Sequence, residues 1–371
     1  MCIIEEMKKT AKTVKYQGYY YNLSHIIEIM ILGILCRLQT MKDIHFWAQS
    51  RPIKEMLREN FQIRKIPCYS HFTNLVGMID SDELNRIFME FFQKLVETLA
   101  GKTVSIDGKT VCSTVNMTKF SSPLHIASAF VVENGITIGQ LAADAKSNEI
   151  PAVQELIKLL DIEGATIVAD ALNCQKKTAE LIISGGADYV LAVKKNQSNL
   201  YDDIAEMVDF KRFNKVEERE SPLEKHTKIE KGHGRIEKRT AYVTQDVKWL
   251  LEREKWAGLQ SIGAIETQNE TRYYISSRIL SAEQLLEFTR REWAVESMHW
   301  QLDVLYGEDR TTLHEENTQK TLNILRKTAL NIIRTYRDRY EPKLNMIDIM
   351  RKCLFDPVFL LELLRRFNDC C

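Results

Sequence analysis

Three acidic residues stand at positions where carboxylates could hold a divalent metal ion. Asp107 follows the run TVSI, Asp170 follows ATIVA, and Glu296 lies in the charged stretch RREWAVESMHWQLDVLYGEDR. The two aspartates end apolar, β-branched runs typical of buried strands, whereas Glu296 falls in a helical pattern. Mg²⁺ and Mn²⁺ prefer oxygen ligands, and two such ions about 4 Å apart support phosphoryl transfer. The three residues therefore predict a metal site built from two strand ends and one helix.

Each of these acids alone is a weak signal in a chain with 51 acidic residues, and their neighbours strengthen it. Glu292 lies one helical turn before Glu296, where like charges cost a few tenths of a kcal/mol, and we expect it to point to solvent. Trp293 and Trp300 share one helix face and are expected in the core. Polar, cationic or aromatic partners near the three acids are Lys109, Asn173, Gln175, Arg290, His299 and Trp300.

Composition indicates an ordinary globular protein without a dominant charge. Lys plus Arg and Asp plus Glu both number 51, so any polyanion must be bound by local basic patches. The eight cysteines form no CxxC and no zinc spacing. The N-terminus lacks a signal-peptide pattern, and the most apolar stretch, Ile26–Cys36, is shorter than the roughly 20 residues of a membrane span. We expect a protein of the reducing cytoplasm with no membrane partner.

The first hundred residues have helical periodicity and predict an N-terminal helical domain, residues 1–100. Its amphipathic faces are better explained by core packing than by a DNA-reading role. The basic lead Lys8–Lys15 could contact phosphate, but we expect a frayed terminus there.

At Gly101 the pattern changes to extended runs, which marks the predicted start of a second domain, residues 101–371. Three antiparallel-type strands, two of them joined by an Asn-Gly hairpin signal, precede helix, strand, helix and strand. That order predicts a mixed α/β sheet with parallel crossovers and flanking helices. Residues from about 197 to 282 are interpreted as a mostly β insertion, and residues from about 315 to 364 as C-terminal helices.

Candidate phosphate contacts fall in three groups. Lys195 and Gln197 close a strand at the same edge as the acids. Lys146 and Asn148 lie at a helix start, a natural anion site, although Asn148 also suits a simple helix cap. Cations on the insertion would make polyanion binding fall with salt, yet interleaved glutamates fit a solvated hairpin equally well on composition. His299 could be a ligand, a phosphate donor or a structural histidine. The insertion candidates are Lys231, His233, Arg235 and Arg239.

Seven segments in the same order resemble the H-repeat-associated branch of the insertion-sequence DDE transposases. They are IDGKT, AKSNEIPAV, VADALNCQ, AVKKNQ, KGHGRIEKR, YYISSR and REWAVESMHWQLDVLYGED. The resemblance runs from about residue 66 to 330, and the helical N-terminus resembles the domain that accompanies these enzymes. It implies an RNase H-like catalytic core whose metal-binding triad falls on Asp107, Asp170 and Glu296. It also favours DNA contacts for the basic insertion and for Lys109, Arg290 and His299 near the triad.

The activity that this resemblance implies is Mg²⁺-dependent cutting of DNA at the ends of a bacterial insertion sequence, with Mn²⁺ as a substitute ion. Water and then a 3′-hydroxyl would attack, and strands would be transferred into target DNA. Because such chemistry brings two element ends together, a homo-oligomer on DNA is expected. The implied partners are therefore terminal-repeat DNA, target DNA and further copies of the chain.

The sequence departs from its relatives at three places. Relatives usually carry Arg at Cys112, His at Glu292 and Asn at Ser297. The loss of two cationic positions leaves open an alternative, a decayed copy that binds DNA without catalysis. A metal hydrolase of small phosphoesters is a third interpretation, and a poorer one because it does not account for the long basic insertion.

Overall fold

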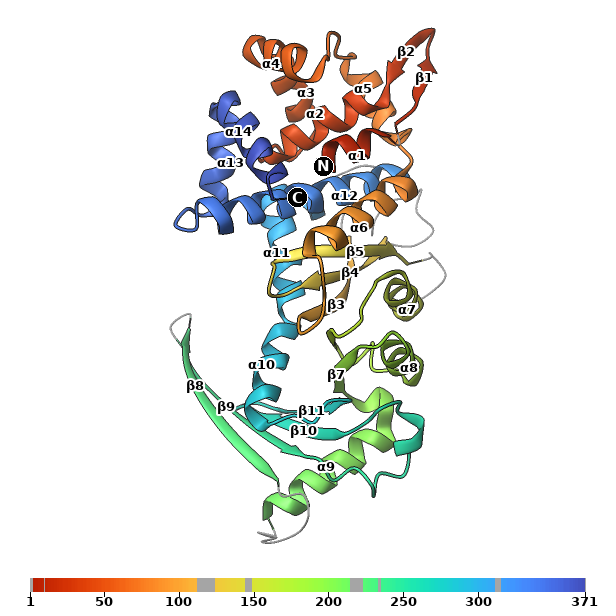
Figure 1. Cartoon of the computed structure of the whole chain (residues 1–371), viewed down its shortest axis with the longest axis vertical. Helices are drawn as coiled ribbons and strands as arrows, with labels where there is room; N and C mark the ends of the chain where they lie inside the picture. Colours follow the sequence, from red (N-terminus) through yellow and green to blue (C-terminus); the bar gives the residue numbers. More distant parts are fainter. Residues whose placement is uncertain are drawn as a thin grey trace.

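The computed structural model describes residues 3–9, 11–111, 124–143, 149–213, 223–232, 235–310 and 315–370. Figure 1 shows an elongated molecule with helices at one end, a sheet through the middle and the β8–β9 hairpin at the other end. Within the described residues, no helix is long and apolar enough to cross a membrane.

A mixed sheet of nine strands, in the order β5-β4-β3-β6-β7-β11-β10-β9-β8, forms the centre of the described structure. The strands β3, β6 and β7 are parallel neighbours, and every other neighbouring pair is antiparallel. This confirms the expected mixed α/β sheet. The strands are β3 Thr103–Thr110, β4 His125–Val131, β5 Ile136–Ala142, β6 Thr166–Ala169, β7 Asp188–Val193, β8 Glu224–Gly232, β9 Arg235–Thr244, β10 Ser261–Glu266 and β11 Thr271–Ser276.

Helices cover both faces of the sheet (Figure 1). The crossover helices α7 and α8 connect the parallel strands, and α10 packs Leu285 and Leu286 over Val168 and Val190 on the opposite face. Ser281 and Gln284 form a capping box that begins α10 at a fixed point. The helices of this part are α7 Glu149–Leu159, α8 Lys176–Ser184, α9 Ser198–Phe213, α10 Ala282–Glu292 and α11 Ala294–Tyr306, with short 3₁₀ turns η2 Lys195–Gln197, η3 Arg253–Lys255 and η4 Glu308–Arg310.

The two ends of the chain form one helical layer beside strand β5. The long helix α12 contacts α2, α5 and α6 as well as β5, so a single apolar core runs from Ile3 to Phe367. The N-terminal segment is ordered, because Ile3, Ile4 and Met7 are buried, and the expected frayed terminus was wrong. The elements are α1 Ile3–Lys9, β1 Thr13–Tyr16, β2 Tyr19–Asn22, α2 Leu23–Leu35, α3 Met41–Ala48, α4 Arg51–Phe61, α5 Tyr69–Gly77, α6 Ser81–Val96, α12 Glu316–Tyr340, α13 Met346–Phe355 and α14 Pro357–Asn368.

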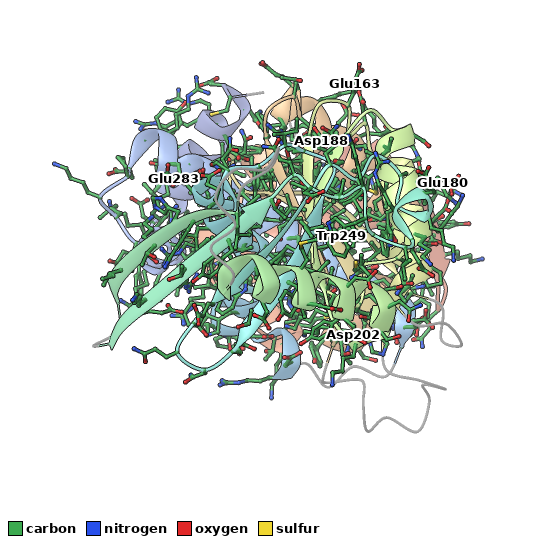
Figure 2. The ribbon with its side chains drawn as sticks, turned by 90° about the horizontal axis from the view of Figure 1, so that it is seen from below. Glu163, Glu180, Asp188, Asp202, Trp249 and Glu283 are labelled. Carbon is green, nitrogen blue, oxygen red and sulfur yellow. The ribbon has the colours of Figure 1, made fainter. Side chains whose placement is uncertain are left out.

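The insertion between β7 and α10 is mostly β, as expected, and it extends the central sheet. Strand β11 pairs with β7, with Tyr274 opposite Ala192, and β10, β9 and β8 follow outward. Figure 2, seen from this end, shows α9 lying across the view beside the long β8–β9 hairpin. The insertion is therefore continuous in hydrogen bonding with the strands that precede it.

Candidate metal centre

Asp107 and Asp170 lie side by side because their strands are parallel neighbours in register. In the β3–β6 pair, Ile106 is opposite Ala169, so the next residue of each chain segment is an aspartate at the same sheet edge. The apolar residues before them, Ile106 and Ala169, are almost fully buried and anchor the strands. The pairing brings together two carboxylates that are separated by more than sixty positions in the sequence.

Glu149, at the start of α7, completes this group. One oxygen each from Asp107, Glu149 and Asp170 lies within 4.8 Å of the others. The Gly108 backbone N–H donates to the Glu149 carboxylate, and a Cβ at Gly108 would overlap that carboxyl group. A side chain at this glycine of the IDGKT segment would therefore displace the Glu149 carboxyl group from its present position.

Asn173 holds the same carboxylates from the turn after β6. Its side-chain amide donates to Glu149 Oε1 at 2.8 Å and to Asp170 Oδ1 at 3.0 Å. Burial raises the pKa of Glu149, the Asn173 hydrogen bond opposes this shift, and the charges of Asp107 and Asp170 reinforce it. The carboxylates of Asp107, Glu149 and Asp170 thus repel one another, and the Asn173 amide offsets only part of this repulsion.

Glu296 lies in the first turn of α11, with its side chain exposed, and it is outside the group of three. Burial of part of the carboxyl and the charge of Asp107 raise its pKa, while His299 and Arg272 oppose the shift. His299 is buried, and its Nδ1 lies 3.6 Å from Asp107 Oδ2. The structure therefore brings Asp107 and Asp170 into one group and places Glu296 within electrostatic range of both.

Glu292 belongs to the same environment, which corrects the expectation that it points to solvent. Its side chain is largely buried, and burial, reinforced by Asp170 and opposed by Arg272, raises the pKa of Glu292 to about 8. The predicted single helix is divided between α10 and α11 at Trp293, and the Glu292 carbonyl accepts from Ser105 Oγ at 2.7 Å. Glu292 is therefore a fifth carboxyl group at this site, beside Asp107, Glu149, Asp170 and Glu296.

The two tryptophans are exposed, so the expectation of core positions was wrong. Trp293 is 44% exposed and Trp300 is 62% exposed. The guanidinium carbons of Arg239 and Arg272 lie 5.8 and 5.4 Å from the Trp293 ring centroid. These cation–π contacts connect the junction of α10 and α11 to strands β9 and β11 of the insertion.

Lys109, a predicted DNA contact, instead pairs with carboxylates inside the protein. Its ammonium lies 2.7 Å from Asp303, 2.9 Å from Glu308 and 3.5 Å from Asp309. Burial alone would raise the pKa of Glu308, but Lys109 and the buried cations behind it outweigh burial and lower it. Asn323 also donates to Glu308, at 2.6 Å. We call Lys109, Asp303, Glu308 and Asp309 the closed ion cluster.

The other predicted phosphate contacts are dispersed. Lys195 is exposed at the carboxyl end of β7, while Gln197 donates to Cys174 O at 3.1 Å. Arg239 pairs with Glu237, and Arg290 pairs with Glu230. The placement of the remaining candidates is outside the described residues or side chains: Lys146, Asn148, Lys231, His233 and Arg235.

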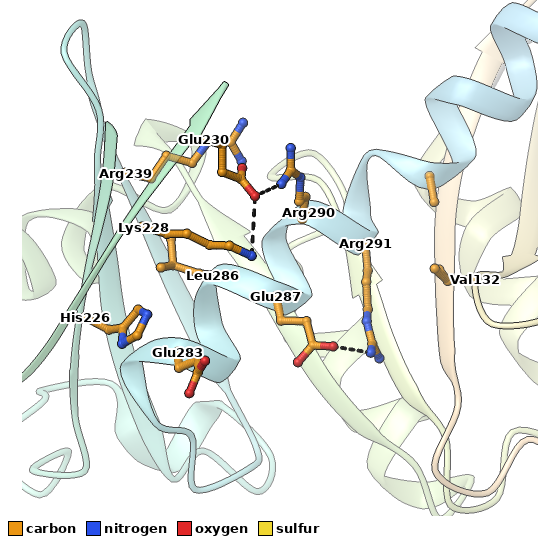
Figure 3. A pocket seen from close by; sticks show the side chains of 11 residues that line it. Val132, His226, Lys228, Glu230, Arg239, Glu283, Leu286, Glu287, Arg290 and Arg291 are labelled. Atoms are coloured by element: carbon orange, nitrogen blue, oxygen red, sulfur yellow. Dashed lines mark hydrogen bonds and ion pairs between the residues drawn. The ribbon is translucent and has the colours of Figure 1, made fainter. Parts of the chain in front are cut away.

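Arg239 and Arg290 line a groove of about 430 Å³ between the β8–β9 hairpin and α10 (Figure 3). The cations of this groove are partly neutralised, because Glu230 accepts from both Lys228 and Arg290. Figure 3 shows these side chains turned toward one another across the groove. Phosphate binding here would have to compete with glutamate.

The donor set of Asp107, Glu149 and Asp170 fits a hard divalent cation. All three ligands are carboxylate oxygens, the kind that Mg²⁺ and Mn²⁺ prefer. Within the described part of the chain, none of the three pairs with a lysine or arginine. Glu149 was missed because an acid beside a helix cap is common, although it lies inside the AKSNEIPAV segment.

Comparison with known families gives two matches that together cover most of the chain. The model described as "Transposase DDE domain" matches residues 102–332. A second model, described as "DDE_Tnp_1-associated", matches residues 13–92. The first match contains all five acidic residues described around the candidate metal centre.

Individual proteins give the same picture. The chain is 31% identical to "Putative transposase YncI" of Escherichia coli O157:H7, over 88% of this chain and 85% of the relative. It is 29% identical to "H repeat-associated putative transposase YhhI" of Escherichia coli K12, over 84% and 85%. A solved structure of the piggyBac transposase in a synaptic complex with hairpin DNA superposes with a TM-score of 0.54 at 11% identity, covering 98% of this chain and 78% of that one. The sheet order and this likeness identify an RNase H-like fold.

Proposed function

Because the chain belongs to the transposase DDE domain family, we propose that it cuts DNA at the ends of an insertion sequence and transfers the strands. The observation that carries this proposal is the meeting of Asp107 and Asp170 at one sheet edge, with Glu149 beside them and Glu296 within electrostatic range, and without a lysine or arginine partner for Asp107, Asp170 or Glu149 among the described residues. We assign the metal ligands as Asp107, Asp170 and Glu296. Mg²⁺, or Mn²⁺ in its place, would activate the attacking oxygen and stabilise the leaving oxygen.

The protein's own groups have separate tasks in this proposal. Asn173 fixes the Asp170 carboxylate, and His299 lies against Asp107, so both aspartates are oriented before substrate arrives. Glu296 is exposed on the first turn of α11, where the charges of Asp107 and Asp170 act on it. Glu149 is the alternative third ligand, because it already lies with them.

For DNA, we propose contacts from Lys195 at the metal edge and from Arg239 and Arg290 in the groove beside α10. Binding through such cations falls steeply with salt because condensed counterions are released. We also propose that two copies pair the two element ends, in keeping with strand transfer. The piggyBac transposase, whose fold is similar, was solved in a synaptic complex with hairpin DNA.

The decisive experiment is a nicking assay with DNA that carries the flanking sequences of the gene, in Mg²⁺. We expect Asp107→Asn, Asp170→Asn and Glu296→Gln each to lose about 10²- to 10³-fold in rate, the usual effect of removing one preorganised electrostatic group. Glu155→Gln, an exposed acid on the same helix as Glu149, is the matched control and should cut normally. If Glu296→Gln cuts like wild type while Glu149→Gln does not, the third ligand is Glu149.

The alternative function is a decayed copy that binds DNA without cutting it. The specific observation that favours it is Glu292, which adds a further carboxyl to the site at a position where the family resemblance implies histidine. Wild-type protein that binds the end DNA but never nicks it, with either metal, would establish this alternative. Recovery of cutting in Glu292→His would identify the cause.

A further inference from the structure

A hairpin far from the metal centre carries an unusual set of exposed side chains. Strands β1 and β2 present Tyr19 and Tyr20, which are 55% and 72% exposed. The Lys65 ammonium lies 5.0 Å from the Tyr19 ring centroid, and the Lys15 ammonium lies 5.8 Å from that of Tyr20. We call Lys15, Tyr19, Tyr20 and Lys65 the tyrosine–lysine surface. Figure 1 shows this hairpin at the helical end of the molecule, beyond α5 and α6.

The two sequence segments that form this surface contain no acidic residues. The chain has 51 Asp and Glu in 371 residues, yet none occurs in residues 7–27 or 60–79, the two segments that supply the surface. Neither Lys15 nor Lys65 forms an ion pair within the part of the chain that the structure describes. In a protein of zero net charge, these two segments therefore carry a local excess of positive charge.

The hairpin is held rigidly by residues other than those it exposes. Gln17 and Gly18 both have positive φ, 47° and 84°, as a two-residue type I′ turn requires. The Tyr21 hydroxyl donates to His71 Nδ1 at 2.9 Å, and His71 Nε2 donates to Gln17 at 2.7 Å. Asn74 of α5 donates to the Tyr16 hydroxyl at 2.7 Å. The exposed tyrosines are thus presented on a fixed support and are not needed to build it.

Exposed tyrosines with cations over their rings match the chemistry of a nucleic acid, which offers flat rings and phosphates together. Solubility alone does not account for Tyr19 and Tyr20, because polar side chains would serve it better than two exposed aromatic rings. Core packing does not account for them either, because neither ring packs against the apolar core. We propose that the tyrosine–lysine surface is a second DNA-binding site, with Lys15 and Lys65 at phosphates and Tyr20 against a sugar or base. The choice of DNA, rather than another polyanion, rests on the proposed function.

The test is DNA binding by the full chain, measured by fluorescence anisotropy in EDTA over a series of KCl concentrations. The probe is a duplex with the flanking DNA of the gene. We expect Lys15→Ala/Lys65→Ala to weaken binding and to lower the slope of log Kd against log salt by about 1.8, the value for two phosphate contacts. Tyr20→Ala should weaken binding about tenfold without changing that slope, and Tyr20→Phe should bind like wild type.

Matched controls separate the surface from general charge. Lys54→Ala/Lys343→Ala removes two exposed lysines, from α4 and from the turn between α12 and α13, and should leave the affinity unchanged. All the changed side chains are exposed, so folding should be preserved, and thermal melts check this. If the hairpin variants bind as the controls do, the inference is overturned. Loss of affinity for polyglutamate instead of DNA would also overturn it, in favour of an acidic protein partner.

The outcomes distinguish this inference from the proposed function. A wild type that nicks DNA while the hairpin variants bind and nick normally leaves the function intact and removes the second site. A wild type that binds DNA through the hairpin but does not nick supports the site and contradicts the cutting activity. A wild type that binds no DNA overturns both.

Discussion

Two groups of three carboxylates lie beside strand β3, and their electrostatic environments are opposite. Asp107, Glu149 and Asp170 meet without a lysine or arginine partner among the described residues, and the pKa of Glu149 is raised by burial and by its neighbours. In the closed ion cluster, the Lys109 ammonium lies among the carboxylates of Asp303, Glu308 and Asp309, and the pKa of Glu308 is lowered.

The difference shows that acid count alone does not identify a metal site. In the closed ion cluster, the Lys109 ammonium neutralises part of the charge of the carboxylates, and the resulting ion pairs stabilise the fold. The open group of Asp107, Glu149 and Asp170 has only the Asn173 amide and a nearby His299 to offset the repulsion of its carboxylates. We therefore propose that the closed ion cluster serves stability and that the open group binds an external cation.

The largest predicted effect is on the closed ion cluster. Lys109→Met should lower the free energy of unfolding by about 3–5 kcal/mol, because the buried Glu308 carboxylate loses its closest cation. Urea unfolding measures this loss. Lys176→Met, which breaks a more exposed pair with Glu252, should change stability little. A loss in Lys109→Met no larger than in this control would contradict the structural role of the cluster.

A second prediction concerns the open group. Mn²⁺ at one hundred times its Kd should stabilise the wild type by about 2.7 kcal/mol, because it binds only the folded state. Asp170→Asn should lose this gain, whereas Asp309→Asn should retain it, since the closed cluster already contains its cation. Chemical unfolding with and without Mn²⁺ gives the measurement. Retention of the gain in Asp170→Asn together with its loss in Asp309→Asn would reverse the assignment of the two groups.

The smallest predicted effect is the pH dependence that Glu292 causes in metal-free protein. Its pKa rises from 4.5 to about 8 on folding, so the folded state keeps a proton that the unfolded chain releases in this range. Stability should therefore fall as pH rises from about 4.5 to 8. Glu292→Gln, which has no proton to lose, should gain about 2 kcal/mol over wild type above that range, with allowance for partial exposure.

Below the lower pKa both proteins carry a neutral group at this position, and the difference should vanish. The matched control is Glu283→Gln, an exposed acid on the same helix, for which no such trend is expected. Unfolding midpoints across pH in EDTA provide the data. A difference between Glu292→Gln and wild type that is constant with pH would show that burial and the charge of Asp170 do not raise the pKa of this carboxyl.

Sequence reasoning predicted the fold and the two aspartates because their signals are local. Apolar β-branched runs identify strands, and the paired neighbours β3 and β6 place Asp107 and Asp170 at one sheet edge, as expected; their role as metal ligands stays a prediction. Glu149 and the environment of Glu292 depend on how α7, α10 and α11 pack on the sheet, which no periodicity encodes. Trp293 was assigned to the core from helical spacing, but the helix divides at that residue and turns it outward.

Lys109 was assigned to DNA because it follows Asp107 by two positions. Its true partners, Asp303 and Glu308, are almost 200 positions away and are brought to it only by the return of the chain through η4. The tyrosine–lysine surface shows the opposite case. Its lack of acids is visible in the sequence, but the meeting of Lys65 with Tyr19 requires the packing of two separate segments.

The continuous sheet has a consequence for solubility. Strand β7 would be an edge strand if the insertion were absent, and its backbone donors and acceptors are paired by β11. An exposed strand edge is a template for aggregation. The insertion therefore shields the β7 edge from self-association, and a shortened chain that lacks β8–β11 would be at risk of precipitating for a reason unrelated to catalysis.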